Sequence, residues 1–408
     1  MSVKRIFFHF GITKTGSTSI QKTLFTNSAI LERNSFRYLN EWKISHRPVF
    51  KLLFKQRPSA NFFINKIRQY YKNSYCKSLL NVIDTTDCET LVLSGEYWTD
   101  FHLDSTIQNL RLFIEEHFQN RGIETKIILF VRNPLTWMIS HLQSRMSSGD
   151  YDRNSDFAET RIEHFPGIWN LKKNFPDSLI LVKFEDAIKD DYGPVGYFLN
   201  TIGFPKDTIP EIDIIKANES RCLEAMEFIN YIEDKEPVFP NGYGKPININ
   251  RELFSRDLAP VFGVKGLKFD LEYKEKLLLW EQLKETVLHI KTNTGIDYTN
   301  YKIPASSELQ TYSEETIQGF IGVFPSLSPV IQKHFLRFFE TKYSKTLNPA
   351  FKSLYFKNSI PKTIYNKHNA ASFFLWYVKK FFYGIKDFIR TMAKHILGRR
   401  VIVKKNHI

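Results

Sequence analysis

The stretch GITKTGST combines glycine, lysine and hydroxyl residues at a spacing that suits phosphate binding. It follows the apolar run RIFFHF and precedes SIQKTLF, an order that predicts a strand, a loop and a helix. Gly11 and Gly16 let the backbone approach an anion closely, and the N–H groups at the helix start attract it. Lys14 adds a positive charge, while Ser17 and Thr18 add hydroxyl donors. The pattern predicts a phosphate-binding loop; the alternative is an ordinary turn with a surface lysine.

This loop differs from the loop of most NTPases, in which lysine directly follows the second glycine. NTPases also hold Mg²⁺ with a loop hydroxyl and with an aspartate at the end of a second strand. Here the strand candidates TKIILFV and TLVLSG are followed by Arg132 and Glu96, and neither supplies that aspartate. The sequence therefore predicts a phosphate site with poor support for Mg²⁺. A P-loop kinase acting on a small molecule or sugar is the alternative.

A second pair of candidate binding residues follows the strand candidate TKIILFV. Arg132 lies at its end, and Ser140 is eight positions later, two turns into the next expected helix. Both side chains can therefore face one ligand at the edge of a sheet. An arginine fork and a hydroxyl suit a terminal phosphate monoester. An arginine at a strand end and a serine on a helix are equally common without a ligand, so this pair alone leaves both interpretations open.

Together the two motifs resemble those of the PAPS-dependent sulfotransferases, most closely the bacterial and carbohydrate sulfotransferases. GITKTGST is similar to the family's 5′-phosphosulfate loop, K-[ST]-G-[ST]-T, and Arg132 with Ser140 is similar to its 3′-phosphate motif, R-x7-S. The later segment KANESRCLEAMEFIN resembles a part typical of the bacterial group. The resemblance covers roughly residues 1–235.

The resemblance implies transfer of a sulfuryl group from 3′-phosphoadenosine 5′-phosphosulfate (PAPS) to a hydroxyl or amine of a saccharide, such as a glycan or surface polysaccharide. The product would be adenosine 3′,5′-bisphosphate, and no metal is required. In this family Lys14 would stabilise charge on the bridging oxygen as its bond to sulfur breaks. The donor-binding residues that the resemblance implies are Lys14, Thr15, Gly16, Ser17, Thr18, Arg132 and Ser140.

One family segment has no match. Small-molecule sulfotransferases end their cofactor site with R-K-G-x-x-G-D-W, whereas this chain has only GVKGLKFD at Gly263–Asp270. The mismatch leaves the adenine contacts and part of the 3′-phosphate site unassigned. It also favours a glycan over a small phenol as the acceptor.

Glu96 is the candidate general base, because it directly follows the strand candidate Thr90–Gly95 at the expected ligand edge. A carboxylate there can take the proton of an acceptor hydroxyl. In the family this place holds a histidine in small-molecule enzymes, and several carbohydrate enzymes use a glutamate base. The alternative is a strand-end glutamate paired with a lysine or a helix start. His9, inside the first strand candidate, is expected to be a buried core residue.

Short apolar runs separated by helical patterns predict an α/β fold with a P-loop-like open parallel sheet flanked by helices. Beyond about Phe204 the strand signal fades, which predicts a mainly helical C-terminal extension. The expected strands are Arg5–Gly11, Thr90–Gly95, Thr125–Val131 and Ser178–Phe184. The expected helices are Thr18–Asn27, Asn61–Ile83, Asp104–Asn120, Pro134–Ser147, Asp156–Asn174, Glu219–Asp234, Leu271–Lys291 and Pro329–Tyr343.

Charge is distributed unevenly over the 408 residues, whose net charge is +14. Residues 351–408 contain 13 Lys/Arg against one acid, a net +12. We expect an α/β PAPS-binding core at 1–235, a mainly helical extension at 236–350 that can shape an acceptor site, and a basic tail at 351–408. Within the tail, residues 372–397 place a basic stripe opposite an aromatic-rich apolar stripe, as in helices that lie on anionic membranes. The alternative is docking on the protein body.

No nucleic-acid-binding motif occurs, so no nucleic-acid partner is expected. No run of 18 apolar residues predicts a membrane span, and the N-terminus has no secretory pattern. The cysteines Cys76, Cys88 and Cys222 show neither metal-site nor disulfide spacing. We expect a cytoplasmic enzyme that is peripheral on the inner membrane face if the tail binds lipid. The remaining alternative is a non-catalytic membrane-peripheral protein on the same fold.

Overall fold

The computed structural model describes residues 3–55, 62–96, 101–147, 166–217, 220–235, 257–305 and 312–343. The chain divides into two compact units. The first consists of residues 1–230 and 262–317, and the second of residues 231–261 and 318–408.

The first unit is built on a five-stranded sheet in the order β2-β3-β1-β4-β5. Every neighbouring pair of strands is parallel. The strands are β1 (Arg5–Phe10), β2 (Phe36–Tyr38), β3 (Thr90–Gly95), β4 (Glu124–Val131) and β5 (Leu179–Lys183). The prediction of an α/β fold with an open parallel sheet is confirmed.

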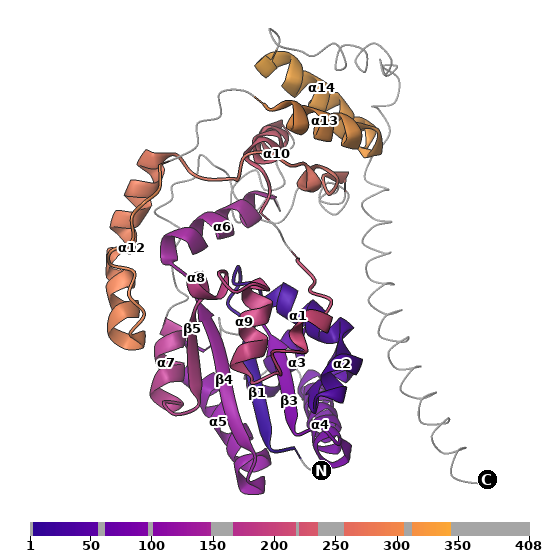
Figure 1. Cartoon of the computed structure of the whole chain (residues 1–408), viewed down its shortest axis with the longest axis vertical. Helices are drawn as coiled ribbons and strands as arrows, with labels where there is room; N and C mark the ends of the chain where they lie inside the picture. The colour runs from indigo at the N-terminus through magenta and orange to yellow at the C-terminus, as the bar shows by residue number, and fades with distance from the viewer. Residues whose placement is uncertain are drawn as a thin grey trace, which may run out of the picture. The chain divides into compact units, whose positions relative to one another are not determined.

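Helices cover both faces of this sheet (Figure 1). Those of the first unit are α1 (Ser17–Thr26), α2 (Ser28–Arg33), α3 (Arg47–Phe54), α4 (Phe62–Thr85), α5 (Asp104–His117), α6 (Pro134–Ser147), α7 (Pro166–Asn174), α8 (Phe184–Ala187), α9 (Gly193–Thr201) and α12 (Tyr273–Thr294). The boundary between the two units falls within two more helices, α10 (Leu223–Lys235) and α13 (Glu314–Val323).

The two faces of β1 explain why its sequence is mostly apolar. Successive side chains of a strand point to opposite sides. Phe8 packs on Phe50 of α3, with ring centroids 5.9 Å apart. Phe7 lies in a cluster with Ile20 of α1 and Phe198 of α9. Because both faces are buried, the strand reads as a continuous hydrophobic run rather than an alternating one.

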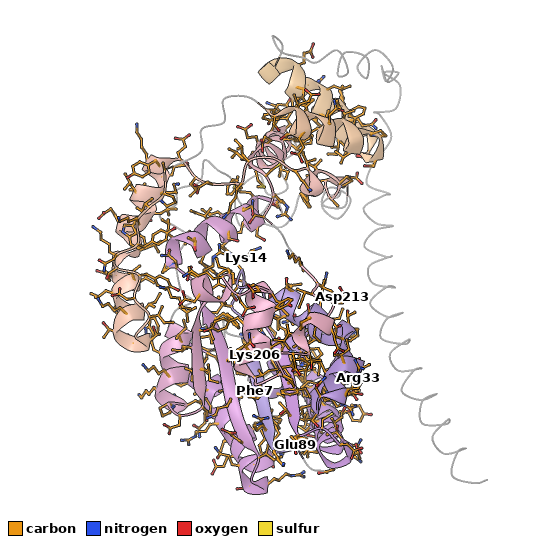
Figure 2. All side chains as sticks on the ribbon, in the orientation of Figure 1. Phe7, Lys14, Arg33, Glu89, Lys206 and Asp213 are labelled. Atoms are coloured by element: carbon orange, nitrogen blue, oxygen red, sulfur yellow. The ribbon has the colours of Figure 1, made fainter. Side chains whose placement is uncertain are left out.

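The carboxyl ends of the parallel strands bring separate sequence motifs to one edge. Gly11 follows β1, Glu96 follows β3 and Arg132 follows β4, and these three strands are adjacent. Figure 2 shows Lys14 at this end of β1 and Glu89 at the opposite end of the sheet. Ligands of open α/β sheets bind beyond the carboxyl edge, so the predicted site residues lie on the expected side.

Several expected elements lie partly or wholly outside the described residues. The helix expected over Asp156–Asn174 is described from Pro166 onward as α7. Residues 236–256 and 344–408 also lie outside, and with them the amphipathic pattern at 372–397. Among the residues that are described, no helix has the length and apolarity needed to cross a bilayer.

The described part of the second unit is helical and has an aromatic core. The buried ring of Phe335 lies 5.8 Å from that of Phe320 and 4.6 Å from that of Phe339. The last helix, α14 (Pro329–Tyr343), supplies two of these rings and α13 the third. The expectation of a mainly helical C-terminal extension is thereby confirmed.

Candidate donor-binding and catalytic site

The loop between β1 and α1 is held by hydrogen bonds to its own carbonyl groups. The oxygen of Ile12 accepts bonds from Thr15 Oγ1 at 2.6 Å and from Ser17 Oγ at 3.3 Å. The oxygen of Thr13 accepts a bond from Trp137 Nε1 at 2.9 Å. With these carbonyls bonded away, the loop N–H groups are left to meet an anion. The Thr15 and Ser17 hydroxyls, predicted to bind the donor, here support the loop.

Glycine is required at two loop positions. A Cβ atom on Gly11 would lie only 2.1 Å from Ser17 Oγ. Gly16 has a φ of 77°, a left-handed conformation in which other residues are strained, and it lies directly before α1. Among the described residues, no side chain caps this helix start. The first-turn N–H groups of α1 therefore add to the positive end of the helix dipole, with Thr18 half-buried in that turn.

Arg132 joins the two sequence motifs. Its Nη1 donates to the Lys14 carbonyl oxygen at 2.7 Å, and its Nε donates to Thr136 Oγ1 at 3.1 Å. Its guanidinium carbon lies 5.2 Å from the ring centre of Phe184. The structure thus brings Lys14 and Arg132, 118 positions apart in sequence, within reach of a single nucleotide.

A cavity of about 260 Å³ opens beside Arg132. Small-molecule sites usually measure about 300–1,000 Å³, so this one can take part of a nucleotide rather than all of it. Ser140 lies on its wall, as the spacing from Arg132 predicted. Its lining residues are Arg132, Leu135, Thr136, Ile139, Ser140, Gln143, Ser220, Lys268, Phe269, Asp270, Lys276, Tyr301 and Pro304.

The segment Gly263–Asp270, which departs from the family pattern, reaches this same cavity through its last three residues. Lys276 is fully buried, and its Nζ donates to Asp270 Oδ2 at 2.6 Å and to the Pro304 oxygen at 2.7 Å. The positive charge of Lys276 is therefore already paired with Asp270. Of the described cations that line the cavity, Arg132 and the exposed Lys268 therefore remain for an anion.

Glu96 lies against the loop, as its place after β3 predicted. A Cβ atom on Gly11 would lie 3.4 Å from Glu96 Cγ. Burial raises the pKa of Glu96 above its ordinary value of 4.5, while Arg47 and Lys14 act to lower it. Conversely, burial and then Arg221 lower the pKa of Lys14, and Glu96 opposes that shift. The carboxylate and the ammonium group therefore belong to one half-buried cluster.

Arg221 is a candidate site residue that the sequence did not reveal. The Arg221 oxygen accepts a bond from Gln143 Nε2 at 2.9 Å, which fixes this segment on α6. Its guanidinium lies 4.0 Å from the Phe262 ring centre, and its buried Nε has no hydrogen-bond partner among the described residues. Of the charged groups around Lys14, Arg221 acts most strongly on the pKa of that lysine. The only sequence signal for Arg221 was its place in KANESRCLEAMEFIN, a segment that resembles part of the bacterial sulfotransferases.

His9 is a core residue, as expected. It is fully buried, its Nδ1 lies 2.8 Å from Ser94 Oγ, and burial lowers its pKa to about 3. It is therefore neutral at physiological pH. In the part of the chain that the structure describes, no group of three or more His, Cys, Asp or Glu side chains could hold a metal ion.

Comparison with known proteins gives only distant structural similarity. No family model matches the chain, and no curated protein matches it in sequence. A sulfotransferase structure from Alicyclobacillus acidocaldarius superposes with a TM-score of 0.31 and 13% identity, covering 52% of this chain and 85% of that one. Retinol dehydratase, in complex with androsterone and the inactive cofactor PAP, gives a TM-score of 0.29 and 14% identity, covering 74% and 84%.

Proposed function

We propose that this protein is a sulfotransferase that moves a sulfuryl group from PAPS to a hydroxyl or amine of a saccharide. The observation that carries the proposal is the 2.7 Å bond from Arg132 to the Lys14 carbonyl. PAPS has a phosphosulfate at its 5′ end and a phosphate at its 3′ end, so it needs two anion sites close together. The loop and the cavity that holds Ser140 meet this need.

The residues of the loop fit the 5′ end of the donor. Glycines at positions 11 and 16 leave room for the backbone to approach phosphate oxygens, and the start of α1 carries no side-chain cap from the described residues. Lys14 supplies the charge beside this cradle. Arg132, Ser140 and Lys268 would hold the 3′-phosphate at the cavity.

Each charged residue around the loop has a separate role in this reaction. As the acceptor oxygen attacks, a new sulfur–oxygen bond forms and the bond from sulfur to the bridging oxygen breaks. The electron pair of the broken bond stays on the 5′-phosphate, where Lys14 stabilises it. Glu96 takes the acceptor proton, and its raised pKa suits a base that works near neutral pH. Arg221, whose charge acts on Lys14, would stabilise the sulfuryl oxygens.

Two features of the sequence support a saccharide as the acceptor. A glutamate stands where small-molecule sulfotransferases have a histidine, and the segment R-K-G-x-x-G-D-W is absent. We also propose a cytoplasmic enzyme that meets its acceptor at the inner membrane face, with residues 372–397 as one contact to anionic lipid.

Donor binding and turnover of Glu96→Gln test the proposal. Calorimetry should show that PAPS binds to wild type and to Glu96→Gln alike, without Mg²⁺. Transfer of ³⁵S from PAPS to a panel of defined oligosaccharides should fall on the order of a hundredfold or more in the variant, as expected for loss of a general base. Glu89→Gln is the matched control, because Glu89 pairs with Lys4 at the opposite end of the sheet. Failure to bind PAPS, together with Mg²⁺-dependent ATP hydrolysis, would favour a kinase instead.

A further inference from the structure

The first turns of α4 expose an unusual number of large apolar side chains. Phe62 and Phe63 are each 70% exposed, and Tyr70 is 58% exposed. Ile64 and Ile67 are 41% and 38% exposed. We call the segment from Phe62 to Tyr70 the α4 tip. A contiguous exposed apolar patch on a protein marks a binding surface more often than an isolated exposed residue does.

The α4 tip is separate from the part of α4 that packs on the core. The buried residues of this 24-residue helix are Leu79, Val82 and Ile83, all in its last two turns. Those turns anchor the helix by their apolar face. The described contacts of α4 with the core thus come from its last turns, while Phe62, Phe63 and Tyr70 of the tip are exposed.

Basic residues predominate in the sequence around the tip. From Trp42 to Ile83 the chain has nine Lys/Arg residues and no Asp or Glu. One of them, Lys66, places its Nζ 4.7 Å from the centre of the Phe62 ring. A surface that combines exposed aromatic rings with lysine and arginine matches the boundary of an anionic bilayer, where rings enter the headgroup region and cations contact phosphates. A second copy of this chain would bring like charges together.

The direction of α4 relates the tip to the anchored end of the helix. Its end lies near the amino edge of the sheet, where Asp84 pairs with Arg121 just before β4, with 2.7 Å between Oδ1 and Nη1. Three turns earlier, the Tyr75 ring lies 5.8 Å from that of Trp42, which follows the carboxyl end of β2. The tip lies farther along the axis of α4, at the end of the helix opposite Asp84.

We propose that the α4 tip inserts its aromatic side chains into the headgroup region of an anionic lipid bilayer. Each nearby Lys or Arg adds about 1 kcal/mol of attraction to such a surface. This contact is independent of residues 372–397 and of sulfuryl transfer itself. If the proposed transfer is also correct, the tip would hold the enzyme at a membrane that carries the acceptor.

Fluorescence from a single added tryptophan tests the insertion directly in the full chain. Phe62→Trp would be mixed with vesicles of phosphatidylcholine alone, or of phosphatidylcholine with phosphatidylglycerol, each made with and without brominated lipid. We expect quenching of the added fluorescence only on the anionic vesicles. Leu288→Trp is the control, because Leu288 is 56% exposed on α12 and away from the tip; its added signal should stay unquenched. If Phe62→Trp binds the vesicles but its added tryptophan fluorescence is not quenched, the proposal is overturned. Other residues would then be responsible for the binding.

Vesicle flotation gives a second, independent readout. Phe62→Ser combined with Lys66→Glu should weaken binding to the anionic vesicles by tenfold or more. Both side chains are exposed, so the thermal midpoint of unfolding should stay close to that of wild type. Unchanged vesicle affinity would contradict the proposal. Sedimentation would also contradict the proposal if wild type self-associates and the double variant does not. That result would identify a second copy of the chain as the occupant of the tip.

Discussion

Glu96 is held between burial, which favours its neutral form, and two cations, which favour its charged form. Burial dominates, so its pKa lies above 4.5. A base must be deprotonated to act, so kcat/KM should fall as the pH drops through this raised pKa. Measurement of kcat/KM against pH in wild type should show that acidic limb, and Glu96→Gln should lack it. Glu89→Gln should keep it. An acidic limb that survives in Glu96→Gln would identify another base.

Arg221 gives a prediction that separates the sulfuryl group from the rest of the donor. Its charge lowers the pKa of Lys14, and its buried Nε has no hydrogen-bond partner in the described part of the chain. Loss of one preorganised donor to a transition state lowers kcat by about 10²–10³. We expect Arg221→Gln to lower kcat by about this factor, with little change in the affinity for adenosine 3′,5′-bisphosphate, which has no sulfuryl group.

Arg221→Lys should restore part of the rate, because it keeps the charge and loses the fork. Rapid-quench turnover and calorimetry on the same samples supply both quantities. Equal losses in turnover and in bisphosphate affinity would instead assign Arg221 to general support of the fold.

At the scale of elements, the loop from β1 to α1 depends on the conformation of Gly16. A Cβ atom there would meet Pro194 Cβ at 3.1 Å as well as a φ of 77°. Gly122 has a similar φ of 70°, but a Cβ atom there meets no described atom within 4 Å. Both alanine variants should lose about 1 kcal/mol of unfolding free energy to backbone strain. Only Gly16→Ala should also weaken bisphosphate binding, measured by calorimetry. Equal binding by both variants would show that the loop does not hold the ligand.

The buried histidines of the sheet layer make stability depend on pH. Burial lowers the pKa of His9 and of His46 to about 3, against 6.5 in the unfolded chain. Below pH 6.5 the unfolded chain therefore binds more protons, and the free energy of unfolding falls as the pH falls. The slope is about 1.4 kcal/mol per pH unit for each histidine. Urea unfolding at pH 7 and pH 5 measures this loss.

His46→Gln isolates one of these contributions. The glutamine oxygen can accept the bond that Ser94 N now donates to His46 Nδ1 at 3.0 Å. The variant should lose about 2 kcal/mol less than wild type between pH 7 and pH 5. An identical loss in the two proteins would mean that His46 is not the titrating group.

The strands of the sheet could be predicted because buried parallel strands are continuous apolar runs. β1, β3, β4 and β5 were found within about a residue of their ends. β2 was missed because three residues, one of them Arg37, give no pattern to detect. The helices α2, α3, α8, α9 and α13 were not predicted either, and of these α2 and α8 have only six and four residues.

The site could be predicted as far as it depends on strand ends. Lys14, Glu96 and Arg132 each follow a strand, and adjacent parallel strands bring their ends together. Arg221 follows no strand. Its position depends on long-range backbone bonds, such as that from Phe269 N to the Arg221 oxygen at 3.4 Å. No local pattern in one sequence specifies such a pairing.

At the scale of the whole molecule, the first unit carries both halves of the proposed donor site. Residues of the loop, of α6 and of Gly263–Asp270 all belong to it. Positive charge is concentrated in residues 42–83, which also belong to the first unit, and in the tail from 351 onward. We therefore expect donor binding to depend on the first unit, and membrane attachment to depend on these basic segments.

Calorimetric comparison of adenosine 3′,5′-bisphosphate with adenosine 5′-monophosphate, without Mg²⁺, tests the central claim most directly. Bonds from a charged group contribute about 1.5–3 kcal/mol, so wild type should bind the bisphosphate at least tenfold more tightly. Arg132→Ala should lose that preference. Equal affinity of wild type for the two nucleotides, or a preference that persists in Arg132→Ala, would contradict the claim that one nucleotide spans the Lys14 loop and the Arg132 cavity.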